Sequence, residues 1–278
     1  MSGLAPEPAP AAPAPAGLRL AAVALAAAIT GVVVGGGGAY FLVRHFDSGA
    51  PGGAAVHSTN PGDGGSASVP ALLAQVAPSL VEVIREPADG SEPGTGDISS
   101  GFVAGTGLVV TSEGAVAGAA GVEVAMDSGQ VVGATIAAAD PDTGVVVLQV
   151  SSTSLPPPLS FAATAPAAGD VALAVSFPVG SSPSIDVGTV SAIGLTLTVP
   201  DLAAPGGTTE LDGVLRTDTS QPQGSSGGPL LDSSGAVIGV LTGDRMEPVD
   251  LGGNAAAAGF ALDASAASSL VSSLLDTG

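Results

Sequence analysis

The chain has no cysteine and no lysine, and its 278 residues include only five arginines and two histidines. Without cysteine it forms no disulfide and offers no thiol chemistry. Five cations against 25 acidic residues, with a net charge of −20, exclude the basic surface that nucleic acids and anionic lipids require. His45 and His57 lie in no metal-ligand pattern, so neither a metal nor a cofactor is expected.

Large aromatic residues are also scarce, with six phenylalanines, one tyrosine and no tryptophan. The apolar share of 45% comes mainly from alanine, valine and leucine and is ample for a core. Glycine (42) and proline (23) are abundant, which favours turns and short strands over long helices. The richness in alanine, glycine and proline also suggests a GC-rich bacterial genome, as in actinobacteria.

The first 68 residues divide into three segments that precede the globular part. Residues 1–17 are rich in proline and alanine and are expected to be disordered. Residues 18–45 contain the uncharged run Leu20–Val43, which is long enough to cross a bilayer about 30 Å thick. A cleaved signal peptide is the alternative, but its apolar core would be shorter. Residues 46–68 are rich in glycine, serine and proline and are expected to form a flexible linker.

This arrangement predicts a single-pass cell-membrane protein. The N-terminal helix would be the membrane anchor, since a polybasic surface is absent. One arginine lies at either end of the apolar run, so charge does not decide the orientation. The short tail before the run and the large acidic domain after it favour an extracytoplasmic C-terminal domain.

Residues 69–278 are predicted to form an all-β domain with a short helix at each end. Strands are expected at Ser79–Arg85, Gly101–Val110, Val122–Met126, Val131–Ala138, Val145–Val150, Asp170–Phe177, Ile185–Ile193, Val214–Thr217, Leu230–Leu231, Ala236–Thr242 and Gly259–Leu262. Helices are expected at Pro70–Val76 and Ala264–Leu275, the second capped by Asp263 and burying Leu270, Val271, Leu274 and Leu275. The proline-rich Leu155–Leu159 divides two lobes, about 69–158 and 159–278.

Several short motifs follow one another in an order that resembles one family. They are Gly105–Val110 with Glu113-Gly114, Asp140–Thr143 followed by Val145–Leu148, Gly188–Ser191, Thr217-Asp218, Gly224–Leu230, Gly235–Val240 and Gly259–Ala261. Their order and spacing are similar to the protease domain of HtrA (DegP-like) trypsin-like serine peptidases. The resemblance covers roughly Val69–Leu275 and implies two perpendicular six-stranded β-barrels with a cleft between them.

The resemblance also implies where the chemistry would be. Ser226 matches the nucleophile position, and the amides of Gly224 and Ser226 match the oxyanion hole, a donor pair for developing negative charge. The family's base histidine lies in a Thr-Asn-Ala-His stretch, and a direct register places it at Gly121. The family's aspartate falls on Gly144. Of the triad, only the serine is expected to remain.

A serine hydroxyl needs a base to become a nucleophile. A Ser–Lys pair is excluded, since lysine is absent. Glu123 or Asp142 could act as a carboxylate base only if burial raised a pKa that is ordinarily near 4. A histidine of the substrate filling the vacancy at Gly121 is the other alternative.

Three functions therefore stay open. The first is a catalytically degenerate, membrane-anchored protease homologue (a pseudoprotease) that binds an extended peptide or envelope protein by strand addition. The second is an active serine endopeptidase with an unconventional base. The third is a structural envelope module. The oligomeric state and the peptide specificity are not determined by the sequence.

Overall fold

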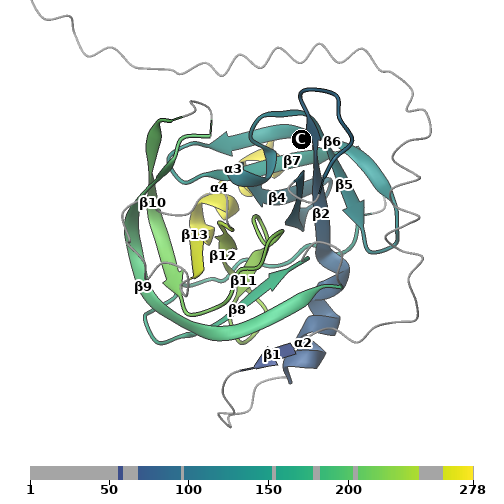
Figure 1. The fold of residues 1–278 in the computed structure, drawn as a ribbon. Coiled ribbons are helices and arrows are strands. Elements are labelled where there is room, and N and C mark those ends of the chain that lie inside the picture. Colours follow the sequence, from purple (N-terminus) through teal and green to yellow (C-terminus); the bar gives the residue numbers. More distant parts are fainter. Residues whose placement is uncertain are drawn as a thin grey trace, which may run out of the picture.

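The computed structural model describes residues 56–58, 68–94, 97–151, 155–177, 182–202, 206–243 and 259–277. In these ranges the chain is almost entirely β-structure, arranged as two sheets with a few short helices around them (Figure 1). The predicted tail at 1–17 and the predicted anchor at 18–45 lie outside the described residues. Among the residues that are described, no helix is long and apolar enough to cross a membrane.

The N-terminal lobe is a closed six-stranded barrel with the strand order β2-β3-β4-β7-β6-β5. Its strands are β2 (Leu80–Pro87), β3 (Ile98–Gly105), β4 (Leu108–Ser112), β5 (Ala119–Met126), β6 (Val131–Asp140) and β7 (Val145–Val150). All neighbours in the barrel are antiparallel. Strands β3 and β4 are buried along their whole length, which explains their nearly continuous runs of small and apolar residues.

The C-terminal lobe is built from β8 to β13, in the order β9-β10-β13-β12-β11-β8, and β8 pairs in turn with β9. Its strands are β8 (Val171–Ser176), β9 (Ser184–Pro200), β10 (Thr208–Thr217), β11 (Pro229–Leu231), β12 (Val237–Leu241) and β13 (Gly259–Asp263). A further strand, β1 (Val56–Ser58), pairs in parallel with β9. The predicted all-β, trypsin-like architecture of two six-stranded units is confirmed, and the N-terminal unit is a closed barrel.

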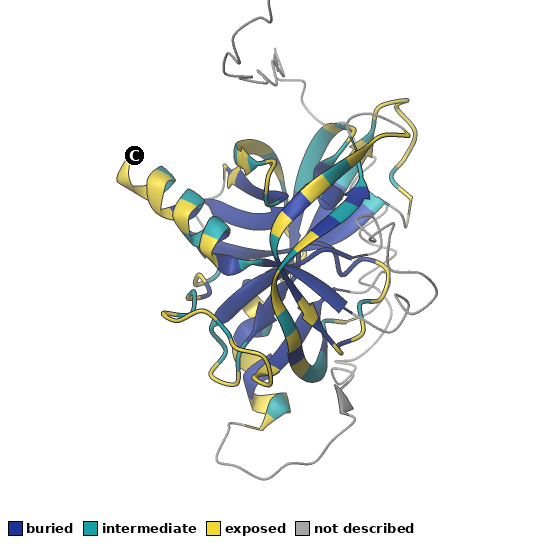
Figure 2. Ribbon diagram, turned by 90° about the vertical axis from the view of Figure 1, so that its left-hand side faces the viewer, coloured by how far each residue is buried: buried dark blue, intermediate teal, exposed yellow. Residues whose placement is uncertain are grey.

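Valine, leucine and alanine fill both lobes in place of large aromatic side chains. One buried cluster fills the N-terminal barrel, one fills the C-terminal sheet, and the largest spans both lobes and the helices beside them. The last cluster includes Phe102, whose ring meets that of Phe161 edge to face at 6.3 Å. Figure 2 shows the buried residues concentrated on the strands, with the exposed ones on loops and on the outer side of the C-terminal helix.

In the part of the chain that the structure describes, three helices and one 3-10 turn pack around the strands: α2 (Val69–Val76), η1 (Ala77–Ser79), α3 (Glu113–Val116) and α4 (Ala264–Asp276). Proline starts α2, and the Asp263 side chain caps α4 by accepting a hydrogen bond from the Ser265 amide at 2.7 Å, both as predicted. The predicted buried face of α4 is only partly correct. Val271 is buried, but Leu275 is 50% exposed because the last turn of α4 extends beyond the barrel.

Three elements differ from the sequence-based prediction. The single strand expected at Gly101–Val110 is two strands, because Gly107 adopts a left-handed backbone conformation (φ +72°) and turns the chain. Strand β9 continues to Pro200 and pairs with a β10 that begins at Thr208, so both are longer than expected. The predicted linker at 46–68 contributes β1 to the sheet.

Candidate functional site

Ser226 lies in the tight turn between β10 and β11, facing the N-terminal barrel. Its hydroxyl is 2.7 Å from the hydroxyl of Ser112, which ends β4, and it donates to the carbonyl of Thr242 at 2.8 Å. Since a hydroxyl has one proton and that proton goes to Thr242, the Ser112 hydroxyl is the donor to Ser226. The Ser226 side chain is 1% exposed. Both partners that the described residues supply are neutral groups, and neither is a proton acceptor of the kind that activates a serine.

Ser100 on β3 fixes the backbone of this turn from the other lobe. Its amide donates to the carbonyl of Ser226 at 2.8 Å, and its hydroxyl donates to the carbonyl of Gly224 at 2.7 Å. The same hydroxyl accepts a hydrogen bond from the amide of Phe177 at 2.9 Å. The conformation at Gly224 (φ +91°) is one that glycine adopts without strain. The turn is therefore held at the junction of the two lobes by buried hydrogen bonds.

Gly227 is enclosed even more closely than Ser226. It has φ +83°, and a Cβ at this position would lie 2.1 Å from Thr111 Oγ1 and 2.3 Å from the Ser100 carbonyl oxygen. Thr111 in turn donates to that carbonyl at 2.8 Å. No side chain fits there without displacing backbone, so the glycine is required by packing as well as by conformation.

Comparisons with known proteins agree with this geometry. A model of the trypsin-like peptidase domain matches residues 99–240, more than half of the chain and including the Ser226 turn. The chain belongs to the trypsin-like peptidase family. Its structure resembles the active form of the Rv3671c protease from M. tuberculosis, with a TM-score of 0.63 and 27% identity over 81% of this chain and 91% of that one.

Curated relatives among the HtrA/DegP-like serine proteases match as well, which confirms the resemblance noted in the sequence. The bovine mitochondrial serine protease HTRA2 is 31% identical over 175 residues, 62% of this chain and 37% of that protein. The serine endoprotease DegS of Haemophilus influenzae is 29% identical over 136 residues, 49% of this chain and 38% of that protein. The matches thus span less than two fifths of the length of either relative.

Within this trypsin-like peptidase, the contact between Ser112 and Ser226 revises the register at the histidine position. With Ser112 at the second position of the Thr-Asn-Ala-His stretch, Thr111 matches the threonine and Gly114 the histidine. Gly114 lies in α3, two residues after Ser112. Gly121, which the sequence-based register selected, lies on β5 opposite Glu86, where a Cβ would be 2.3 Å from the Glu86 carboxylate. The geometry therefore favours Gly114 over Gly121.

Gly144, the predicted aspartate position, lies next to this helical turn. Its carbonyl accepts the amide of Glu113 at 2.8 Å, which places it beside the residue that precedes Gly114. Gly144 has φ +70°, a conformation that non-glycine residues rarely adopt. Gly114 and Gly144 thus adjoin Ser112 and Glu113, the first of which contacts Ser226, and neither glycine carries an ionisable side chain.

The two carboxylates weighed as substitute bases, Glu123 and Asp142, lie on β5 and in the turn between β6 and β7. Asp142 is exposed, and its amide donates to the side chain of Asp140 at 3.1 Å. Glu123 lies on β5 between Ile84 and Gly133. Burial raises the pKa of Glu123, and the neighbouring charge of Glu86 raises it further. No hydrogen bond joins either side chain to Ser226 among the residues that the structure describes.

Glu113 is a carboxylate that the sequence-based reasoning did not single out. It starts α3, and burial raises its pKa, with a smaller contribution from the charge of Asp201 in the other lobe. A carboxyl whose pKa is raised by folding stabilises the fold when protonated, and this contribution is lost as the pH rises through the folded pKa.

Glu113→Gln is therefore expected to make the chain more stable than wild type at pH 7. The gain should be below about 1 kcal/mol, because the side chain is only half-buried. It should shrink as the pH falls through 4.5, the ordinary value for glutamate, and disappear at lower pH, where the wild-type carboxyl is protonated in both states. Urea unfolding at pH 4 and pH 7 measures this difference. The exposed Glu92→Gln serves as the control, and an equal pH response in both variants would contradict the assignment.

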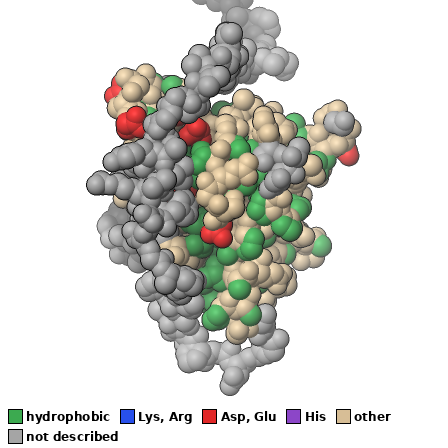
Figure 3. All heavy atoms as spheres, turned by 90° about the vertical axis from the view of Figure 1, so that its right-hand side faces the viewer, with side chains coloured by type: hydrophobic (Ala, Val, Ile, Leu, Met, Phe, Trp, Pro, Cys, Tyr) green, Lys and Arg blue, Asp and Glu red, His purple; other side chains and the backbone are tan. Residues whose placement is uncertain are grey.

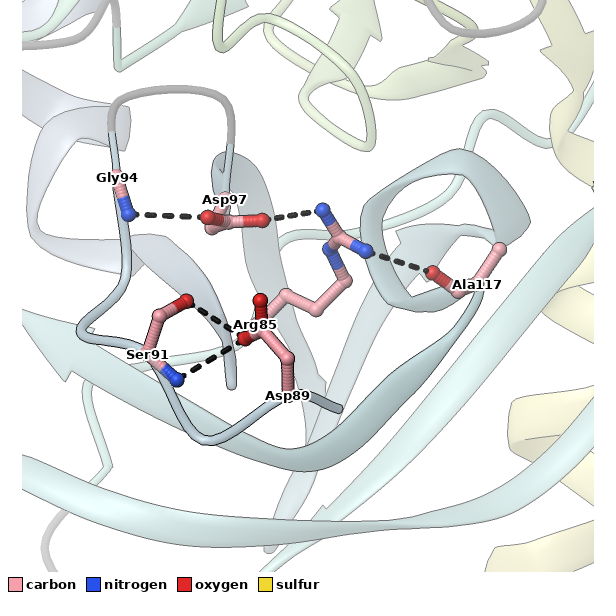
Figure 4. Close-up of polar contacts among 6 residues, drawn as sticks. All are labelled: Arg85, Asp89, Ser91, Gly94, Asp97 and Ala117. Carbon is pink, nitrogen blue, oxygen red and sulfur yellow. Dashed lines mark hydrogen bonds and ion pairs between the residues drawn. The ribbon is translucent and has the colours of Figure 1, made fainter. Parts of the chain in front are cut away.

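Arg85 on β2 contacts the C-terminal end of α3 (Figure 4). Its guanidinium forms an ion pair with Asp97 and donates to the carbonyl of Ala117, the residue that ends α3, at 3.2 Å. Arg85 and Asp97 are 17% and 16% exposed, so the pair is largely shielded from water. Asp97 also accepts the amide of Gly94 at 2.9 Å. This network connects the loop between β2 and β3 with the helical turn that carries Gly114.

Asp97→Ala is expected to lower the free energy of unfolding by about 2 kcal/mol, because it leaves the Arg85 guanidinium shielded and unpaired. Asp89→Ala in the same loop is the matched control. Asp89 is fully exposed, and the Ser91 amide and then the Ser91 hydroxyl lower its pKa. Chemical denaturation of both variants gives the comparison. Equal losses of unfolding free energy in the two variants would show that the Arg85–Asp97 ion pair does not stabilise the fold more than the exposed contacts of Asp89 do.

Two neighbours of Ser226 were missed by the sequence reasoning. Ser112 replaces an asparagine of the family pattern, and only the register correction reveals its match. Thr242 contributes a backbone carbonyl, which no side-chain motif reports. A check of which residues follow the glycine-rich strand without a gap would have found Ser112.

Proposed function

We propose that this chain is a membrane-tethered trypsin-like (HtrA-like) protease homologue that binds an extended peptide or envelope protein without efficient cleavage. Family membership supports the scaffold. The uncharged run Leu20–Val43 supports the tether, and the short tail before it and the large acidic domain after it support an extracytoplasmic position of the domain. Both remain proposals about the whole protein.

The absence of efficient cleavage is carried by the environment of the Ser226 hydroxyl. Its proton is directed to the carbonyl oxygen of Thr242, and its second partner is the hydroxyl of Ser112. Peptide-bond attack requires that proton to leave as the new bond forms, and an amide carbonyl is far too weak a base to take it. Removal of the base and its orienting partner from such a triad typically lowers turnover by about 10⁴–10⁶.

Peptide binding is supported by what the scaffold still offers. Because β8 pairs with both β11 and β9, the end strand of the C-terminal sheet is β1, which lies on β9. A strand edge of this kind can pair with an extended chain, and this mode of recognition needs no catalytic base. The net charge of −20 favours a neutral or basic ligand over an acidic one. On the face in Figure 3, the described side chains are apolar, neutral or acidic, and none of the described ones is basic.

A fluorophosphonate serine probe tests the proposal on the full chain. We expect wild type to label no more than Ser226→Ala, while an active trypsin-like protease in the same assay labels fully. Casein should remain intact, and a peptide selected from a library should bind wild type and Ser226→Ala equally. Labelling that disappears in Ser226→Ala would identify an active endopeptidase instead. Absence of any peptide ligand would favour a structural envelope module.

A further inference from the structure

The N-terminal part of β9 is a sheet edge that the C-terminal lobe itself does not cover. Strand β8 pairs with β9 over residues 184–189. Strand β10 pairs with β9 from Val190 onward, and its pairing ends where Thr217 meets Val190. Neighbouring residues of a strand point their backbone groups to alternate sides. The side of β9 opposite β8 therefore has backbone donors and acceptors at Ile185–Val187 that require a partner.

That partner is β1. Val56, His57 and Ser58 pair in parallel with Ile185, Asp186 and Val187, respectively. Strand β1 is only three residues long, and the ten residues 59–68 connect it to α2. A pairing of this length is weak by itself, and it is maintained by the high effective concentration that a short connection provides.

The edge is also joined directly to the segment that leads to Ser226. The side chain of Asp186 accepts a hydrogen bond from the amide of Ser220, six residues before Ser226. Two residues further along β9, a Cβ at Gly188 would be 2.2 Å from the Asp218 carboxylate and 2.9 Å from the Thr219 side chain. Asp218 in turn accepts the amide of Thr189. The β9 edge is thus in contact with residues 218–220, which lead to the turn that carries the serine.

We infer that the β9 edge at Ile185–Val187 is the strand-addition site of this domain, that Val56–Ser58 is its built-in occupant, and that the peptide ligand binds by displacing it. This rests on the proposed peptide-binding function and names the place where binding occurs. The ligand is an extended segment that adds in parallel. Because residue 57 is in register with Asp186, a ligand with a basic or neutral residue there is favoured, and one with an acidic residue is disfavoured.

Amide hydrogen exchange of the full chain, followed residue by residue in β9 by NMR, tests this inference. Two variants, His57→Pro and Val56→Pro/Ser58→Pro, together remove every backbone N–H of β1, so one of them removes those that face β9. That variant should increase exchange of the β9 amides that face β1 by about tenfold or more. Asp63→Pro, in the same connection but outside β1, should leave them unchanged. Unchanged exchange in both β1 variants would overturn the inference.

The second arm adds a synthetic peptide of residues 53–62 to the affected proline variant. We expect the peptide to restore protection of the same β9 amides, and its His57→Asp version to bind roughly two- to fivefold more weakly. No protection at β9, or protection at another strand, would also overturn the inference. Neither arm depends on the reactivity of Ser226. A chain that labels with the serine probe but still exchanges β1 for peptide would refute the proposed loss of cleavage and leave this site intact.

Discussion

Gly227→Ala is expected to lower the free energy of unfolding by about 2–4 kcal/mol. The added Cβ would lie 2.1 Å from Thr111 Oγ1 and 2.3 Å from the Ser100 carbonyl, and the φ of +83° disfavours any L side chain. Both neighbours belong to the N-terminal barrel, so this steric clash can be relieved only if the two lobes separate slightly. Urea unfolding of the purified variant gives the value.

Gly129→Ala separates the clash from the backbone strain. Gly129 has nearly the same φ, +80°, but nothing lies within 4 Å of its Cβ position in the turn between β5 and β6. It should lose only the strain contribution, about 1 kcal/mol. If the two variants are destabilised equally, the close packing at Gly227 contributes nothing beyond its dihedral angle.

Gly114→His is expected to increase the rate at which a fluorophosphonate labels Ser226 by about 10²-fold, within the range that a positioned general base supplies. The new imidazole would stand two residues after Ser112, whose hydroxyl already contacts that of Ser226 at 2.7 Å. Adding Gly144→Asp should increase the rate less than an aspartate does in an intact triad, because φ +70° strains the new side chain. The labelling rates of wild type, Gly114→His and the Gly114→His/Gly144→Asp variant are measured by quenching the reaction at set times and quantifying the adduct.

Gly121→His is the matched control for this gain. It introduces the same side chain at the position that the direct sequence register selected, but the Glu86 carboxylate lies there. It should label no faster than wild type, and Ser226→Ala on the Gly114→His background should abolish the labelling. A gain at position 121 and none at position 114 would restore the original register.

Much of the fold could be predicted from the sequence, because short apolar runs between glycine-rich turns are local signals. The pattern placed β7 correctly at Val145–Val150 and came within two residues of β8 and β13. It merged β3 with β4, since a two-residue turn at Thr106-Gly107 interrupts the apolar pattern so briefly. It also ended β9 too early, at Ile193, because the pattern is interrupted at Gly194 (φ +64°), although the second half contains the buried Leu197 and Val199 and pairs with β10.

The site was predicted less completely, for a different physical reason. Ser226 and Gly224 are carried by a motif whose residues are adjacent in sequence, whereas the histidine position depends on a register across a loop without an imidazole to anchor it. The contact that decides the register, between Ser112 and Ser226, joins residues 114 positions apart. A single sequence gives this register only if the residues after the glycine-rich strand are matched without a gap.

The packing of Gly227 against β3 and β4 has an evolutionary implication. A trypsin-like domain that no longer cleaved peptides would still need this turn to hold its two lobes together. Substitutions of the turn glycines would then be selected against because they destabilise the fold. The sequence motif of a hydrolase can thus persist after hydrolysis is lost, because it holds the two lobes together. The presence of the motif alone does not show that the protein turns over substrate.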